Sequence, residues 1–182
     1  MNLCVCPWWL SFLIGNSVRK LIHNPGKILE GYIRNGQTVI DIGCGPGFFT
    51  IPMARLVGEK GHVIAVDVQK KMLEYVYRRG EKEGLLEQIH LHQCTNRELG
   101  VREYVDFALA FYVAHEVPNI DAFFKEVVKI LRPHALFLLV EPKLHVTMSR
   151  FREMIWLACS IGLTCHKELK VRGSRAILFS LE

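Results

Sequence analysis

The sequence predicts an α/β fold built on a doubly wound, mostly parallel sheet of seven strands. Two observations predict this fold. The apolar run Val39–Ile42 leads into a glycine-rich turn and a helix start, and a second apolar run, Val63–Val66, ends at Asp67. From residue 36 onward, strand-like runs alternate with segments of helical periodicity. That alternation is typical of parallel strands whose crossover helices cover both faces of the sheet.

The first strand and helix occupy residues 38–57. Thr38–Ile42 is the strand, and Phe48–Val57 is the helix that follows the turn. Pro52 lies within about the first turn of that helix, where a missing N–H does the least harm. Gly58 comes directly after Val57 and is a natural C-terminal stop.

The next four elements are a strand, a helix and two further strands. His62–Asp67 is the second strand, and Gln69–Gly80 is predicted to be helical because its apolar residues recur at helical spacing. Gln88–Gln93 is the third strand, and Val105–Phe111 is the fourth.

The last third of the chain continues the pattern and then changes. Asn119 or Asp121 caps a helix whose apolar residues face the core, and Pro133 ends it. The fifth strand is Ala135–Val140. The remaining elements are a helix at 147–162 and two strands at about 164–170 and 174–181.

Composition limits the class of protein. The chain has 182 residues, of which 50% are hydrophobic, and this suits one globular domain with one substantial core. The net charge of +5 is mild. No run combines dense basic residues with interleaved aromatic residues, so nucleic-acid binding is not expected.

The turn after the first strand carries the main chemical signal. Gly43, Gly45 and Gly47 follow Asp41 with the spacing G-x-G-x-G, and glycine lets a backbone approach a ligand closely. Asp67 lies 20 positions after Gly47, where a second parallel strand can present a carboxylate to a ribose. Dinucleotide sites instead use G-x-G-x-x-G around a pyrophosphate, which the Asp41 carboxylate would repel. The pattern therefore favours a nucleoside cofactor that carries an ammonium group.

The run Asp41-Ile42-Gly43-Cys44-Gly45-Pro46-Gly47 resembles the first motif of the class I S-adenosylmethionine (SAM)-dependent methyltransferases. Asp67 resembles the ribose-binding acid of that family. The resemblance covers roughly residues 36–143 well and the rest more weakly. It implies a Rossmann-like fold, a final strand inserted antiparallel beside the fifth, and SAM as the cofactor.

The resemblance also implies roles for individual residues. Asp41 would help to hold the amino-acid part of SAM, and the glycine turn with Cys44 would lie beneath the methionine moiety. Asp67, with Val68 beside it, would accept hydrogen bonds from the ribose hydroxyls. Two simpler interpretations stay open, namely a tight turn without a ligand and an Asp67 that is only a surface turn acid.

Two further loops would complete the site. The family commonly has an acid near the adenine, and here Thr95 takes that position with Asn96 beside it. Either side chain could bind the adenine edge, and a plain loop is the alternative. Phe111 would pack near the cofactor. His115 and Glu116 form an adjacent acid–base pair that could take a proton, or could merely line the pocket and cap a helix.

Cysteines and histidines predict neither disulfides nor a metal site. The cysteines contain no C-x-x-C pair, which is typical of reduced thiols in a cytosolic protein. The histidines show no ligand spacing with carboxylates. The paired acids of metal-dependent catechol-type methyltransferases and the cysteine set of arsenic-methylating relatives are also missing. The six cysteines are Cys4, Cys6, Cys44, Cys94, Cys159 and Cys165.

The amino terminus is apolar over residues 3–14, a run shorter than the roughly 20 residues that span a bilayer. No basic region precedes it, so a secretory signal is not expected. We interpret residues 1–35 as a helical extension in which Trp8, Trp9 and Phe12 form a lid over the acceptor pocket. A homodimer interface and a peripheral membrane contact are the alternatives.

The leading hypothesis is a cytoplasmic methyltransferase with one domain, 1–182, and a core at 36–182. It would transfer a methyl group from SAM to a small molecule, since the loop after the fourth strand resembles the quinone and small-molecule branch of the family. Two alternatives remain. One is a SAM-binding partner subunit without catalysis, and the other is an NAD(P)-dependent reductase, against which the glycine spacing argues.

Overall fold

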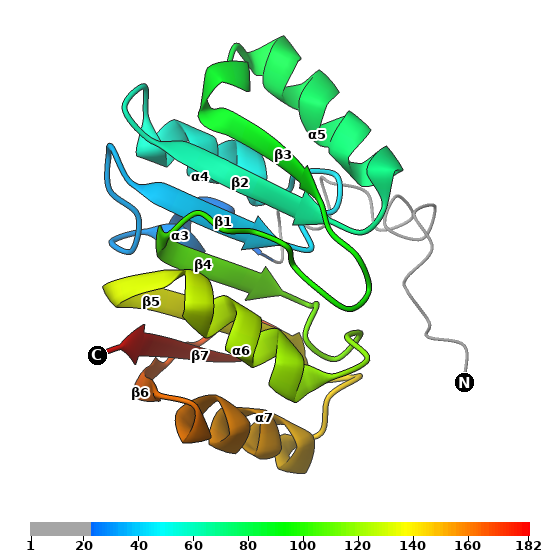
Figure 1. Ribbon diagram of the computed structural model, residues 1–182, viewed down its shortest axis with the longest axis vertical. Coiled ribbons are helices and arrows are strands. Elements are labelled where there is room, and N and C mark those ends of the chain that lie inside the picture. The colour runs from blue at the N-terminus through cyan, green and yellow to red at the C-terminus, as the bar shows by residue number, and fades with distance from the viewer. Residues whose placement is uncertain (1–22) are drawn as a thin grey trace.

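A mixed sheet of seven strands forms the centre of the computed structural model, which describes residues 23–182 (Figure 1). The spatial order of the strands is β3-β2-β1-β4-β5-β7-β6. The strands β1 to β5 pair in parallel, and β7 is antiparallel to both β5 and β6. The predicted fold class is confirmed, including the antiparallel strand beside the fifth.

The elements follow one another as strands and crossover helices, and their labels are those of Figure 1. In chain order they are α3 (Pro25–Leu29), β1 (Thr38–Ile42), α4 (Thr50–Val57), β2 (His62–Asp67), α5 (Lys70–Glu83), the short 3-10 helix η1 (Leu86–Gln88), β3 (Ile89–Gln93), β4 (Val105–Phe111), α6 (Ile120–Ile130), β5 (Leu131–Pro142), α7 (Met148–Ser160), β6 (Leu163–Glu168) and β7 (Ser174–Leu181).

The predicted end of the second helix at Gly80 is wrong, because α5 continues to Glu83. Gly84 is the C-cap instead, in the left-handed conformation with φ +67°. Gly80 is a packing residue. A Cβ at this position would lie 3.0 Å from the Ile89 side chain and 3.1 Å from that of Leu86. The glycine therefore lets α5 approach the start of β3 closely.

The helix between β4 and β5, α6, ends earlier than predicted. Asn119 is its N-cap and accepts a hydrogen bond from the Ala122 N–H at 3.0 Å, whereas Asp121 lies inside the first turn. The helix ends at Ile130, and Pro133 lies inside β5 rather than terminating α6. The register between β4 and β5 shifts at this end, between Val105 and Phe107. Proline has no N–H to donate to a ladder, and an irregular stretch of strand tolerates that.

Each face of the sheet carries its own hydrophobic core, because successive strand residues point to opposite faces. In β4, Ala108 and Ala110 belong to one core, and Phe107 and Leu109 to the other. The first core is closed by α6 and α7, on the near side of the sheet in Figure 1. The second is closed by α3, α4 and α5. Both faces are covered, as a parallel sheet requires.

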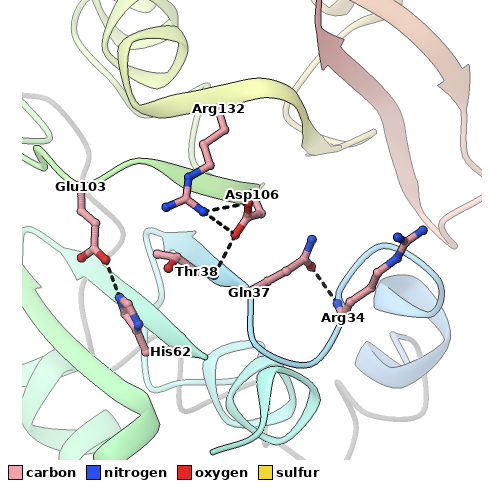
Figure 2. A network of polar contacts seen from close by, with 7 residues as sticks. All are labelled: Arg34, Gln37, Thr38, His62, Glu103, Asp106 and Arg132. Atoms are coloured by element: carbon pink, nitrogen blue, oxygen red, sulfur yellow. Dashed lines mark hydrogen bonds and ion pairs between the residues drawn. The ribbon is translucent and has the colours of Figure 1, made fainter. Parts of the chain in front are cut away.

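The amino ends of the strands are joined by polar contacts (Figure 2). The Asp106 carboxylate accepts a hydrogen bond from the Thr38 N–H at 2.9 Å and pairs with Arg132 at 3.0 Å. These contacts connect β1, β4 and β5 at the edge of the sheet that is opposite to the glycine-rich turn.

Two sequence predictions concern the segment before the sheet. Trp8, Trp9 and Phe12 lie outside the described residues, so the lid stays a prediction. In the part of the chain that is described, α3 is a short helix capped by Asn24, whose side chain accepts from the Lys27 N–H. No helix within residues 23–182 has the length and apolar character needed to cross a membrane.

Candidate functional site

A cavity of about 960 Å³ opens at the carboxyl edge of the parallel strands. The loops that follow β1, β2, β3 and β4 all contribute to its lining. Parallel α/β sheets place their ligands at this edge, since the loops there are free to vary while the sheet holds them rigidly. The volume lies in the range of small-molecule sites.

The three glycines of the first turn all have positive φ, but they differ in what surrounds them. A Cβ on Gly43 would lie 2.2 Å from the Val113 side chain, so this glycine allows the loop after β4 to approach. A Cβ on Gly47 would lie 3.2 Å from Val76 of α5. A Cβ on Gly45 would meet no atom within 4 Å, and this residue lines the cavity. Gly45 is therefore the position where the backbone faces open space.

Asp67 ends β2 and lies against the same turn. Its Oδ2 accepts the Gly45 N–H at 2.9 Å, and its Oδ1 accepts the Gln69 N–H at 2.9 Å. Burial raises the pKa of this carboxyl, while the backbone hydrogen bonds from Gln69, Gly45 and Val68 oppose the rise. Each carboxylate oxygen retains acceptor capacity beyond one bond. Asp67 and Val68 both line the cavity.

Asp41 and Cys44 lie below the cavity rather than in its lining. The buried Asp41 carboxylate accepts a hydrogen bond from the Thr50 hydroxyl at 2.6 Å, which ties β1 to the start of α4. The Cys44 N–H donates to the Val66 carbonyl at 2.9 Å. Burial raises the pKa of the Cys44 thiol well above its ordinary value, with the Asp41 and Asp67 charges adding to the rise.

The loop after β3 brings Thr95 and Asn96 to the cavity. The Thr95 hydroxyl oxygen accepts from the Arg97 and Glu98 N–H groups, at 3.2 and 3.1 Å, and so caps its own turn. Asn96 is exposed. The backbone of this loop is joined to β2, since the Cys94 N–H donates to the Asp67 carbonyl at 3.2 Å.

His115 is held by a carboxylate that was not predicted from the sequence. Its Nδ1 lies 2.5 Å from Oε2 of Glu141, near the carboxyl end of β5. The other oxygen of Glu141 accepts the Ala114 N–H at 2.9 Å, and Glu141 is fully buried. In a neutral imidazole, the Nδ1 proton serves this bond and Nε2 is the acceptor. His115 and Glu116 both line the cavity.

The protonation of His115 follows from these neighbours. Burial lowers the pKa of His115, but the hydrogen bond and charge of Glu141, with a smaller contribution from Glu116, raise it overall above its ordinary value. Glu116 Oε1 is 3.9 Å from Nε2 of His115, so Glu116 is the weaker partner.

Glu141 is the acid nearest the end of the fifth predicted strand, and that position is the signal that could have identified it.

An aromatic wall closes the other side of the cavity. The Tyr112 hydroxyl lies 2.6 Å from Ser174 Oγ and 3.2 Å from His23 Nε2. Its φ of +65° is rare for a residue with a side chain. Phe111 packs against Tyr112 and His23, with ring centroids 4.4 and 5.2 Å apart. The sequence predicts Phe111 at this wall, but it does not predict Tyr112, His23 or Ser174.

Comparison with known families identifies the chain. A family model described as "Methyltransferase domain" matches residues 33–171, which is most of the sequence.

The chain belongs to the class I SAM-dependent methyltransferases.

Two solved structures have the same fold as this methyltransferase. A SAM-dependent methyltransferase from Aquifex aeolicus has a TM-score of 0.80 at 24% identity, over 90% of this chain and 93% of that one. A SAM-dependent O-methyltransferase from Thermotoga maritima has a TM-score of 0.70 at 17% identity, over 87% of this chain and 64% of that one.

Curated relatives of the methyltransferase include enzymes named for quinone biosynthesis. The ubiquinone/menaquinone biosynthesis C-methyltransferase of Vibrio vulnificus is 31% identical over 109 residues, which are 59% of this chain and 42% of the relative. The demethylmenaquinone methyltransferase of Lactobacillus johnsonii is 29% identical over 102 residues, or 56% and 42% of the two chains. The chain thus matches less than half of the length of these relatives.

Proposed function

We propose that this chain transfers a methyl group from SAM to a small phenolic acceptor of the hydroquinone type. The observation that carries the proposal is the single cavity that joins Asp67 and Gly45 at one end to His115 at the other. A ribose acceptor and a proton acceptor in one cavity are what a methyl donor and a hydroxylated substrate require together.

The residues of the cofactor end fit SAM. Gly45 presents open space, while its N–H donates to Asp67 and holds that buried carboxylate at the cavity. Asp67 keeps acceptor capacity for the ribose hydroxyls. Asp41 acts from below the turn, where its charge favours the ammonium of the methionine part. Thr95, Asn96 and Phe111 line the same cavity, and we assign the first two to the adenine edge and Phe111 to the wall. The buried Cys44 side chain packs beneath the turn, and Gly47 lets the turn approach Val76 of α5 closely.

Proton removal is the step that the chain itself performs. His115 Nε2 takes the proton from an acceptor hydroxyl, while Glu141 holds Nδ1–H and balances the imidazolium that forms. The resulting phenolate is richer in electrons at its oxygen and ring carbons than the phenol. SAM, when bound, supplies a methyl group on a positively charged sulfur, ready for such a nucleophile. The one proton that methylation releases is the proton that His115 takes.

The acceptor end of the cavity suits a ring with an apolar substituent. Val117, Pro118 and Phe123 line it, and Leu144 at its lining is 95% exposed. The names of two relatives above support this choice, since one refers to ubiquinone and menaquinone biosynthesis and the other to demethylmenaquinone. The structure of the methylated product shows whether carbon or oxygen receives the methyl group.

The test is turnover. The full chain is incubated with SAM and a short-chain naphthohydroquinone that is kept reduced, and S-adenosylhomocysteine formation is measured. We expect product with the hydroquinone and none with its dimethyl ether, which has no proton to give. Replacing His115 by Gln should lower turnover by about 10²- to 10⁴-fold, as loss of a general base does, and should leave S-adenosylhomocysteine affinity unchanged.

The matched control is His166→Gln, since this histidine is exposed on β6 and removed from the cavity. It should keep full turnover. A chain that binds S-adenosylhomocysteine tightly but methylates no phenolic compound would contradict the proposal and favour the non-catalytic partner subunit. A His115→Gln variant with full turnover would leave the methyltransferase but remove the proposed base.

A further inference from the structure

Three potential metal ligands meet at the edge of the sheet opposite to the cavity. His62, His90 and Glu103 each offer one ligand atom, and these atoms all lie within 4.8 Å of one another. His62 begins β2, whose other end is Asp67. His90 is the second residue of β3, and Glu103 lies two residues before β4. Because these positions are distant in the sequence, no spacing motif revealed the cluster.

The contacts among the three side chains are close. His62 Nε2 lies 2.8 Å from Glu103 Oε1 (Figure 2), and the rings of His62 and His90 stack with centroids 4.1 Å apart and an interplanar angle of 29°. The buried Nε2 atom of His62 nevertheless has no hydrogen-bond partner within residues 23–182. The distance to Glu103 is short enough for an ion pair, but the contact is not a hydrogen bond. The hydrogen-bonding capacity of His62 Nε2 is therefore not used by any residue in the described range.

The connection between β3 and β4 explains why this cluster is accessible. Residues 94–104 cross the sheet as a loop without a helix, in the part of the chain that is described (Figure 1). His90 and Glu103 are exposed as a result, and a hollow of about 310 Å³ lies beside them. Arg102, a positively charged residue, lines the same hollow as His90 and Glu103.

We propose that His62, His90 and Glu103 bind a zinc ion. Two imidazoles and a carboxylate are ligands of borderline divalent metals, and zinc sites with three protein ligands keep a fourth position for water. The hollow beside His90 and Glu103 provides space for that water. The buried His62 Nε2, which has no hydrogen-bond partner among the described residues, would coordinate the metal through its lone pair. The inference is independent of the proposed acceptor.

The site has a structural consequence for the cavity. Glu103 lies near the end of the loop whose first part, Thr95–Leu99, lines the cavity. A metal bound by Glu103 together with β2 and β3 fixes that end of the loop against the sheet. Zinc should therefore raise the thermal unfolding midpoint of the protein.

The test measures zinc binding directly by calorimetry, with tag-free, chelator-treated full chain at neutral pH. Cys159 and Cys165 are replaced by Ser throughout, because their exposed thiols lie 3.3 Å apart and would themselves bind zinc. In this background, zinc should bind and raise the unfolding midpoint. Cobalt(II) should give the absorption of a nitrogen- and oxygen-ligated tetrahedral site without a sulfur-to-metal band.

The variants His90→Gln and Glu103→Gln replace exposed residues, so the fold should be retained, and unfolding without metal checks it. Loss of a residue that only hydrogen-bonds a metal ligand weakens metal binding by about 10- to 100-fold. Each of these variants removes a ligand itself, so zinc binding should weaken by more than that. His166→Gln is the control and should bind zinc as its parent does. Failure of the parent to bind zinc, or unchanged binding in both ligand variants, overturns the site and shows a surface ion pair only.

Discussion

Glu141 and His115, 26 residues apart in the chain, share a 2.5 Å contact between Oε2 and Nδ1 at the carboxyl edge of the sheet. One is buried at the end of β5, and the other lines the cavity from the loop after β4. A buried carboxylate therefore sets both the orientation and the charge of a histidine that lines the cavity.

The first prediction concerns the pH dependence of turnover. Because His115 must be neutral to take a proton, and because its pKa is raised, activity should rise with pH through a value above that of an ordinary histidine. Removing the charge with Glu141→Gln should lower that pKa and move the acid limb of kcat/KM to lower pH. Glu116→Gln should move it less, since Glu116 is the smallest cause of the rise.

An acid limb that stays in place in Glu141→Gln would contradict the role of Glu141 as a positioning residue, even if activity falls. A fall in activity alone would also follow from a disturbed fold, so the position of the limb is the decisive measurement.

The second prediction concerns stability. A histidine whose pKa is raised in the folded state stabilises the protein most at pH values below its unfolded pKa, about 6.5, and this stabilisation is lost as pH rises through the folded value. The free energy of unfolding of wild type relative to His115→Gln should therefore be larger at about pH 5 than at about pH 9. Urea titrations of both proteins at the two pH values check the difference. Equal differences would show that the ionisation does not contribute.

The third prediction concerns Asp67→Ala. The charged acceptor that we propose for the ribose is lost, which should cost roughly 1.5–3 kcal/mol of SAM binding, or about 10- to 150-fold in affinity. The fold should survive with a lower unfolding midpoint, because the bonds to the Gly45 and Gln69 N–H groups are lost as well. Calorimetry with S-adenosylhomocysteine measures the affinity. Asp121→Ala, on the exposed surface of α6, removes the same charge and should not change it. Unchanged affinity in Asp67→Ala would place the ribose elsewhere.

The fourth prediction separates two neighbouring glycines. Alanine is strained at both, since φ is +67° at Gly43 and +51° at Gly45. At Gly43 the new methyl group would also collide with Val113, so Gly43→Ala should destabilise the protein more. Gly45→Ala instead places its methyl group in the cavity and should weaken S-adenosylhomocysteine binding with the smaller loss of stability.

Adding Val113→Ala provides the check on this comparison. It should restore part of the stability of Gly43→Ala, because it removes the colliding atoms, and it should not help Gly45→Ala. Identical effects of Val113→Ala on both variants would contradict the assignment of Gly43 to packing.

The fifth prediction concerns the exposed thiols of Cys159 and Cys165, whose sulfur atoms lie 3.3 Å apart. A diazene oxidant that accepts two hydrogens should join them in a disulfide, seen as a cross-linked peptide by mass spectrometry. Burial and the neighbouring Cys159 thiol raise the pKa of Cys165 to about 11, so its thiolate is scarce at neutral pH. Cross-linking should therefore become faster as pH rises. Cys159→Ser should abolish it, and a cross-link to another cysteine would contradict the pairing.

The sequence by itself determined the fold, and it located the turn and the acid that meet at the cavity. Apolar runs, helical periodicity and glycine punctuation predicted all seven strands, because these are local properties that burial on a two-sided sheet imposes on each segment. The same local properties identify Gly43, Gly45 and Asp67. A glycine-rich turn follows the first strand and an acid ends the second, so both can be recognised from residues close together in the sequence. Helix ends were less reliable, as Gly80 and Pro133 show, because packing against other elements decided their roles.

Only the tertiary structure decided which distant side chains meet. Glu141 reaches His115 because β4 and β5 are neighbours in the sheet and both end at the cavity. His62, His90 and Glu103 meet because β2 and β3 pair and the loop before β4 returns to their edge. No periodicity or spacing encodes such meetings, since they depend on strand order and register. The chemistry of both clusters therefore follows from the packing of the whole sheet.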